Sequence, residues 1–153
     1  MKKKDEYFVY FIYDGWFSVK IGYSDDYEKR IKELQAGNPL KLYVVDAICV
    51  NNEIRARLLE KALHKMFESE KMIGEWFKAA PVFKFLDYFC TVREIRLNDK
   101  GLVLAHTDEF FEMNHLPYPE EYETEDPEER VKELKETGFR LYSNLIYDLS
   151  GLK

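Results

Sequence analysis

The chain has 153 residues, enough for one domain with a real core or for one domain with an appendage. Charged residues make up 34% of it, and no apolar run approaches the roughly 20 residues of a membrane-spanning helix, so we expect no membrane protein. The formal charge of −6 excludes a broadly basic nucleic-acid binder. Residues 1–90 carry 15 Lys and Arg against 14 Asp and Glu, whereas residues 91–153 carry 8 against 15.

A hairpin and a helix are predicted at the start of the chain. Residues 7–13 are β-branched or aromatic throughout, which indicates a buried strand. A turn at 14–16 leads to a second strand at 17–23, so the two should pair antiparallel. Asp25 and Glu28 have the spacing of a capping box, and a helix follows until residues 37–39. Its apolar stripe consists of Tyr27, Ile31 and Leu34.

The next elements complete the predicted fold. Residues 40–50 form a third apolar run and are interpreted as a strand. Two asparagines at 51–52 precede a longer helical pattern over 53–68, which the segment 73–77 breaks. Pro81 can open a further helix. This order predicts an α+β fold, with a small, mainly antiparallel three-stranded sheet flanked by helices.

Beyond residue 90 the patterns weaken. Residues 102–104 predict a short strand, residues 117–130 an acidic, proline-broken linker, and residues 139–149 a further strand. We therefore divide the chain into a domain at 1–90 and an acidic C-terminal extension at 91–153. The extension is expected to complete the sheet, to bind a protein partner or a second copy of the chain, or to cover a site.

The two cysteines and the N-terminus bear on the compartment. Cys49 and Cys90 both lie in apolar surroundings, so they are interpreted as buried thiols rather than as a disulfide framework. The basic N-terminus leads into no signal-type apolar segment. Both features predict a cytoplasmic, reducing location.

Several short motifs occur in a characteristic order. They are "FVYFI" around Tyr10, "KIG" at 20–22, a helix carrying Arg30, "LEKALH" at 59–64 and "GEWF" at 74–77. This ordered set resembles the GIY-YIG nuclease superfamily, and in particular its phage-type DNA-binding branch, over about residues 6–90. Phe8 stands in place of the superfamily's first glycine and Lys20 in place of its second tyrosine. We find no match to its late asparagine.

The resemblance implies a metal-dependent endonuclease that cuts nucleic acid, with DNA as the family's substrate. It places Tyr10 at the motif tyrosine, where the hydroxyl would act as a general base for an attacking water. A tyrosine pKa near 10 is high for this task, and a cation nearby would lower it. Lys20, across the hairpin, is a candidate for that cation. The alternatives are a core tyrosine and a lysine on the solvent face of its strand.

Arg30 matches the superfamily's catalytic arginine. Its position borders the apolar stripe of the helix, and its planar, permanently charged fork suits two phosphate oxygens. In that role it would stabilise charge that develops on the phosphodiester. The alternative is an ion pair on the helix surface with Asp26 or Glu33.

Glu60 and His64 share one face of the longer predicted helix. By the resemblance, Glu60 holds one hydrated Mg²⁺ or Mn²⁺, as a single carboxylate can at phosphoryl sites. His64 would contact phosphate or move a proton, and Glu75 would support the site. Without the resemblance, the same residues describe a solvated helix face.

Two other function classes stay open. One is a phosphate-binding module that does not cut, because the late asparagine is missing. The other is a protein-interaction domain whose acidic C-terminal part mimics nucleic acid or covers the site. Salt separates them, since binding to phosphate weakens steeply as salt rises.

Overall fold

The computed structural model describes residues 6–89, 96–97, 103–104 and 106–116, and these residues fall into two compact units. The first unit contains the described residues through Ala79, and the second contains those from Ala80 onward. The predicted linker at 117–130, the strand at 139–149 and Cys90 lie outside the described residues.

The first unit is built on a five-stranded sheet in the order β3-β1-β2-β5-β4, with every neighbouring pair antiparallel. Its strands are β1 (Tyr7–Tyr13), β2 (Ser18–Ser24), β3 (Tyr43–Val50), β4 (Lys71–Ile73) and β5 (Trp76–Lys78). The α+β class is confirmed, but the count of three strands is wrong. The segment 73–77, which we interpreted only as a helix break, belongs to the β4–β5 hairpin around Gly74. Strands of three residues are too short to show an alternating pattern.

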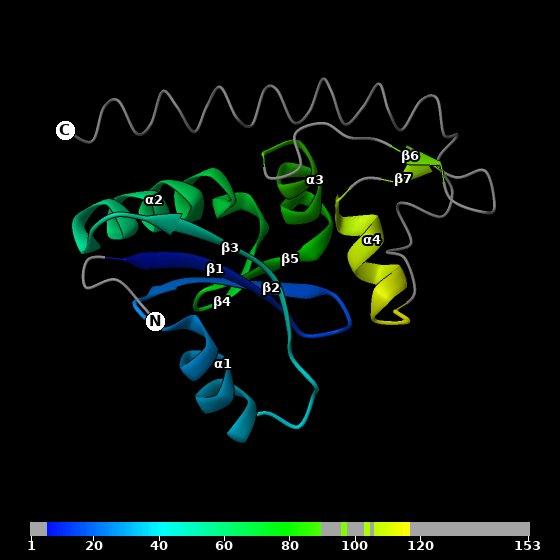
Figure 1. Cartoon of the computed structure of the whole chain (residues 1–153), viewed down its shortest axis with the longest axis horizontal. Coiled ribbons are helices and arrows are strands. Elements are labelled where there is room, and N and C mark those ends of the chain that lie inside the picture. The colour runs from blue at the N-terminus through cyan, green and yellow to red at the C-terminus, as the bar shows by residue number, and fades with distance from the viewer. Residues whose placement is uncertain (1–5, 90–95, 98–102, 105, 117–153) are drawn as a thin grey trace. The chain divides into compact units, whose positions relative to one another are not determined.

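Two helices cover opposite faces of this sheet (Figure 1). They are α1 (Tyr27–Ala36) and α2 (Glu53–Met66), followed by the short 3₁₀ helix η1 (Glu68–Glu70). Tyr10 and Ile12 of β1 form a buried cluster with Leu42, and side chains of α1 pack against it: Tyr27, Ile31 and Leu34. Side chains alternate along a strand, so the odd-numbered residues of β1 and β2 face α2.

Both helices start at side-chain caps. The α1 cap is Asp26, whose carboxylate accepts a hydrogen bond from the backbone N–H of Lys29 at 3.1 Å. The predicted Asp25–Glu28 box is therefore displaced by one residue, because the Ser24 hydroxyl accepts from the Asp26 N–H and fixes the turn there. Asn52 caps α2 as predicted, at 2.8 Å from the Arg55 nitrogen.

The described part of the second unit consists of α3 (Ala79–Phe89), which begins at the boundary, a two-stranded ribbon and α4 (His106–Met113). Pro81 lies in the first turn of α3, as predicted. The ribbon pairs β6 (Arg96–Leu97) with β7 (Val103–Leu104), so the short strand predicted at 102–104 is present. Phe83 and Phe111 join α3 to α4 edge to face, with ring centroids 4.8 Å apart.

Two further observations concern the environment of the chain. No helix in the described ranges is long and apolar enough to cross a membrane. Cys49 is exposed on β3, so the prediction of a buried thiol is wrong for this residue. Among the strands that the structure describes, β3 is at an edge of the sheet.

Candidate active site

The centre of the candidate site is the contact between Tyr10 and Gly22. These residues are directly opposite each other in the β1–β2 hairpin, and the phenol ring lies over the glycine. A Cβ added at Gly22 would lie 2.5 Å from Tyr10 Cζ and 3.0 Å from Cε1, distances that real Cβ atoms do not tolerate. Glycine at this position therefore lets the Tyr10 hydroxyl reach across β2. Sequence analysis predicted the hairpin, but its turn at 14–16 would place Tyr10 opposite Lys20. In the structure β2 begins at Ser18 and Tyr13 pairs with Val19, so Tyr10 lies opposite Gly22.

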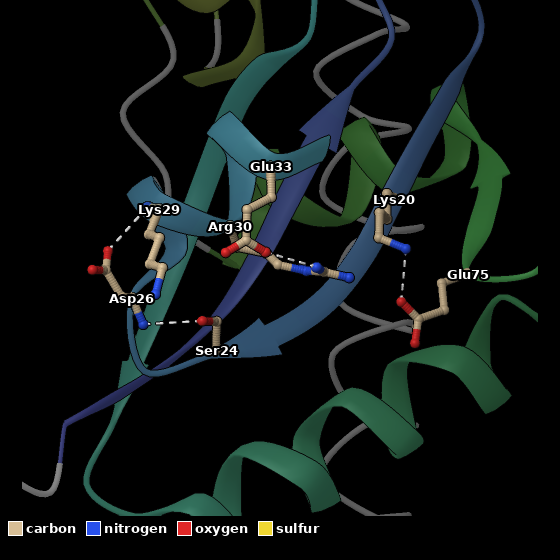
Figure 2. A network of polar contacts seen from close by, with 7 residues as sticks. All are labelled: Lys20, Ser24, Asp26, Lys29, Arg30, Glu33 and Glu75. Atoms are coloured by element: carbon tan, nitrogen blue, oxygen red, sulfur yellow. Dashed lines mark hydrogen bonds and ion pairs between the residues drawn. The ribbon is translucent and has the colours of Figure 1, made fainter. Parts of the chain in front are cut away.

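Arg30 reaches the same point from α1. Its guanidinium comes close enough to the Tyr10 side chain to shift the pKa of both groups, and it contacts Glu33 at 3.1 Å. Both partners raise the pKa of Arg30, and the interaction with Tyr10 is the largest cause. The expected surface ion pair with Glu33 is thus present together with the contact to the sheet. Figure 2 shows the Arg30–Glu33 contact on α1, beside β2.

The pKa of Tyr10 is raised above 10.0. Burial is the largest cause, and Arg30 opposes it, whereas Glu75 and Glu60 add to the increase. The side chain is only 2% exposed, which explains why loss of solvation dominates. The cation that acts on Tyr10 is therefore Arg30 rather than Lys20, and the phenol is protonated at neutral pH.

Lys20 is buried, at 8% exposure, so the alternative of a solvent-facing lysine is wrong. Its ammonium group contacts a carboxylate oxygen of Glu75 at 2.8 Å (Figure 2). The same group lies 5.9 Å from the centre of the Trp76 ring. Glu75 lies in the turn between β4 and β5, two strands that sequence analysis did not predict. The β5 strand pairs with β2 at Lys20, and this pairing brings the two charges together.

The outer edge of β2 supplies the rest of the site. β5 covers this edge only as far as Lys20, and three other groups satisfy the backbone beyond it. The Ile21 N–H donates to the Glu75 carbonyl at 3.1 Å, and the Ile21 carbonyl is 2.8 Å from His64 Nε2. The Glu60 carboxylate accepts a hydrogen bond from the Tyr23 backbone. Glu60 and His64 therefore anchor α2 to β2, whatever chemistry they also perform.

The pairing of His64 fixes its protonation pattern. A carbonyl oxygen only accepts hydrogen bonds, so Nε2 must carry a hydrogen when it bonds to Ile21. The neutral ring then keeps its lone pair on Nδ1. The ring also packs against Phe77, with centroids 5.0 Å apart. These two contacts hold the orientation of the imidazole.

Glu60 is half-buried, and its pKa is raised from 4.5. Loss of solvation is the largest cause and the charge of Glu75 adds to it, whereas His64, Lys20 and the Tyr23 N–H oppose it. An ionised carboxylate in this position is stabilised by any additional positive charge. A hard divalent cation with water as its remaining ligands fits this single oxygen donor group. No group of three His, Cys, Asp or Glu side chains that could enclose a metal occurs in the part of the chain that the structure describes.

The structure thus gathers the residues that the motifs predicted around one strand. Tyr10 and Arg30 meet over Gly22, while Lys20, Glu60 and Glu75 interact electrostatically at the edge of β2. Sequence analysis missed two contributors: Trp76 beside Lys20, and Tyr23 as the donor to Glu60.

The comparisons with known proteins agree with this picture at a coarse level. The family model of the T5orf172 domain matches residues 7–121. The chain belongs to the T5orf172 domain family. This phage-associated domain is related to nuclease-type folds of the GIY-YIG and HNH-like kinds. The match to the T5orf172 domain extends beyond residue 90, into the part that we assigned to the extension. No curated protein and no solved structure matches the chain.

Proposed function

We propose that this T5orf172 domain hydrolyses phosphodiester bonds of nucleic acid, with DNA as the expected substrate. The observation that carries the proposal is the Tyr10 hydroxyl packed against Gly22, where it interacts with the charge of Arg30. A guanidinium held against a phenol offers phosphate binding and a proton acceptor at one point. A tyrosine needed only for packing would not require a glycine opposite its hydroxyl or an arginine beside it.

Arg30 binds the scissile phosphate in this mechanism. Its contact with Glu33 joins two side chains that are 44% and 50% exposed, and exposed pairs of this kind contribute little stability. A phosphate group can therefore replace Glu33 at low cost. The guanidinium then stabilises the negative charge that develops as water adds to phosphorus. Lys20 is the further contact that we assign to the phosphate, and His64 joins it when Nδ1 also carries a hydrogen, because a lone pair cannot donate to a phosphate oxygen.

Tyr10 removes the proton from the attacking water. The new bond joins the water oxygen to phosphorus, the phosphorus–sugar oxygen bond breaks, and the departing oxygen takes a proton from solvent. Because the pKa of Tyr10 is raised, only a small fraction is ionised at neutral pH. The rate should therefore rise with pH through the neutral range, without a plateau below about pH 10.

Glu60 is the residue that would hold the divalent cation, Mg²⁺ or Mn²⁺. When bound, such a cation supplies positive charge to the departing oxygen and lowers the cost of leaving. Glu75 supports the site by keeping Lys20 in place at 2.8 Å. We also propose an intracellular, reducing location for this activity, which the low cysteine content fits.

The test is nicking of supercoiled plasmid in Mg²⁺ or Mn²⁺ by the wild type, Arg30→Ala and Glu60→Ala. Arg57→Ala and Glu68→Ala are matched controls, since both residues are exposed charged residues of α2 and η1. We expect metal-dependent nicking that falls by about 100-fold or more in the first two variants only. Equal nicking by Arg30→Ala and Arg57→Ala would refute the assigned role of Arg30.

A phosphate-binding module without cleavage is the second candidate. Two observations favour it. The pKa of Tyr10 is raised, so the phenol is not activated as a base. Arg30 and Lys20 are each paired with a carboxylate, that of Glu33 and that of Glu75. The same proteins distinguish the two. Salt-sensitive binding of DNA by the wild type, lost in Arg30→Ala and without nicking in either metal, would establish the module.

A further inference from the structure

The turn between β1 and β2 presents an exposed tryptophan on a rigid support. Trp16 is 72% exposed and Phe17 is 41% exposed, and their rings contact each other edge to face at 4.5 Å. Because Trp16 is exposed, it does not contribute the stabilisation that burial of a large aromatic side chain provides. A chain reversal needs no aromatic residue, since small polar residues and glycine serve it best.

Buried polar groups fix the backbone of this turn. The carboxylate of Asp14, itself 8% exposed, accepts hydrogen bonds from the backbone N–H groups of Trp16, Phe17 and Ser18 at 2.8, 2.9 and 3.1 Å. The Ser18 hydroxyl donates to the second oxygen of the same carboxylate. Gly15 takes the positive φ of 80° that the turn requires. The orientation of Trp16 is therefore set before any ligand arrives.

Tyr13 secures the other side of the turn. Its hydroxyl donates to the Trp16 carbonyl at 2.8 Å. Burial, and next to it the charge of Asp14, raises the pKa of Tyr13 to about 12, so this donor keeps its proton throughout the neutral range. The Phe17 carbonyl accepts a further hydrogen bond from the Ala79 N–H at 2.9 Å.

Two lysines belong to the segments that lie next to the turn. A Cβ at Gly15 would be 3.2 Å from the Tyr43 ring and 3.6 Å from the Lys41 carbonyl, so the segment before β3 lies against the turn. The Lys41 ammonium lies 5.1 Å from the centre of the Tyr43 ring. Lys78 is exposed on β5, opposite Ser18. An exposed aromatic ring flanked by cations is the arrangement that binds unpaired nucleotides, with a base on the ring and phosphates on the lysines.

We infer that Trp16 is a stacking platform for an unpaired base of the nucleic acid whose phosphodiester lies at Tyr10 and Arg30. This inference rests on nucleic acid as the ligand of the proposed function. It defines the substrate class as single strands, or junctions that carry a single-stranded segment. Asp14 lies four positions after Tyr10, or about 13 Å at the rise of a strand. A stacked strand covers that distance in about four nucleotides.

The experiment measures binding of labelled oligonucleotides of about 12 nucleotides, single-stranded and duplex, by fluorescence anisotropy in EDTA. The variants are Trp16→Ala, Trp16→Leu and Trp16→Phe. Ile54→Ala is the matched control, because Ile54 is 67% exposed on α2. Thermal unfolding of each variant confirms that the fold is intact.

We expect the wild type to prefer the single strand and Trp16→Ala to lose about tenfold in that affinity, as loss of one stacked base predicts. Trp16→Leu should be as weak as Trp16→Ala, Trp16→Phe should stay within about threefold of the wild type, and duplex binding should not change. Unchanged single-strand affinity in Trp16→Ala would overturn the inference. So would an equal loss on the duplex, or full retention by Trp16→Leu, which would indicate general apolar docking of a partner.

Plasmid nicking by the wild type and Trp16→Ala, measured in parallel, separates this inference from the proposed function. Nicking, together with single-strand binding that does not depend on Trp16, would refute the stacking platform but not the proposed function. Trp16-dependent binding without nicking would refute hydrolysis and support the platform. Absence of binding to both oligonucleotides would overturn the platform.

Discussion

Replacement of Gly22 by alanine is the most direct test of the site geometry. The new methyl group would lie 2.5 Å from Tyr10 Cζ, whereas ordinary contacts begin near 3.4 Å. The ring must therefore move by about 1 Å or the strands must separate, and overpacking of this kind costs about 1–3 kcal/mol. For a chain of this length, that corresponds to a decrease in Tm of roughly 3–9 °C.

The same displacement should affect the proposed chemistry. Movement of the phenol takes its hydroxyl away from Arg30, which belongs to α1, the helix that covers the Tyr10 face of the sheet. Misplacement of a reacting group by about 1 Å costs on the order of 100-fold in rate. We therefore expect Gly22→Ala to lose both stability and nicking activity.

Gly37→Ala is the matched control. Gly37 ends α1 with φ of −97°, and a Cβ there meets nothing within 4 Å, so its Tm should stay close to that of the wild type. The Tyr10→Ala background supplies a second control, because the cost of Gly22→Ala should disappear when the ring is absent. Thermal unfolding followed by circular dichroism measures the wild type, the three single variants and the Tyr10→Ala/Gly22→Ala double variant. Equal Tm values for Gly22→Ala and Gly37→Ala would refute the close contact.

Two further predictions concern the charges at the edge of β2. Glu60→Gln should raise stability at neutral pH by up to about 1 kcal/mol, since it removes a poorly solvated charge beside Glu75. The pKa of Glu60 in the folded protein lies above 4.5, so the wild type loses stability relative to Glu60→Gln as pH rises through that pKa. If the difference in Tm between the two proteins does not grow between about pH 4 and pH 7, the predicted pH dependence is wrong. Glu75→Gln leaves the Lys20 ammonium, whose side chain is 10% exposed, without its carboxylate and should cost about 1–3 kcal/mol. Lys20→Met removes the ammonium charge but keeps the packing of the aliphatic part of the side chain. A larger decrease of the urea midpoint in Lys20→Met than in Glu75→Gln would show that the Lys20–Glu75 pair itself stabilises the fold.

Local patterns were sufficient for the elements that carry most of the site. The aromatic run at 7–13, the turn after it and the caps before α1 and α2 depend on residues close together in the chain, and they correspond to the observed elements within about one to three residues. The order of the motifs also indicated the residues that the sheet and helices bring together. These were Tyr10 and Lys20 on the hairpin, Arg30 on the first helix, and Glu60 and His64 on the second.

Partners distant in the chain could only come from the tertiary structure. Lys20 and Glu75 are 55 positions apart, and His64 and Ile21 are 43 apart, so no local period relates them. Their contacts depend on β5 pairing with β2 rather than with another edge, and on a hairpin whose strands are three residues long. The sequence alone therefore determined which residue types were available for chemistry. The order of the strands decided which charges neutralise each other, because the hydrogen-bond partners of a β-strand are set by its neighbours in space.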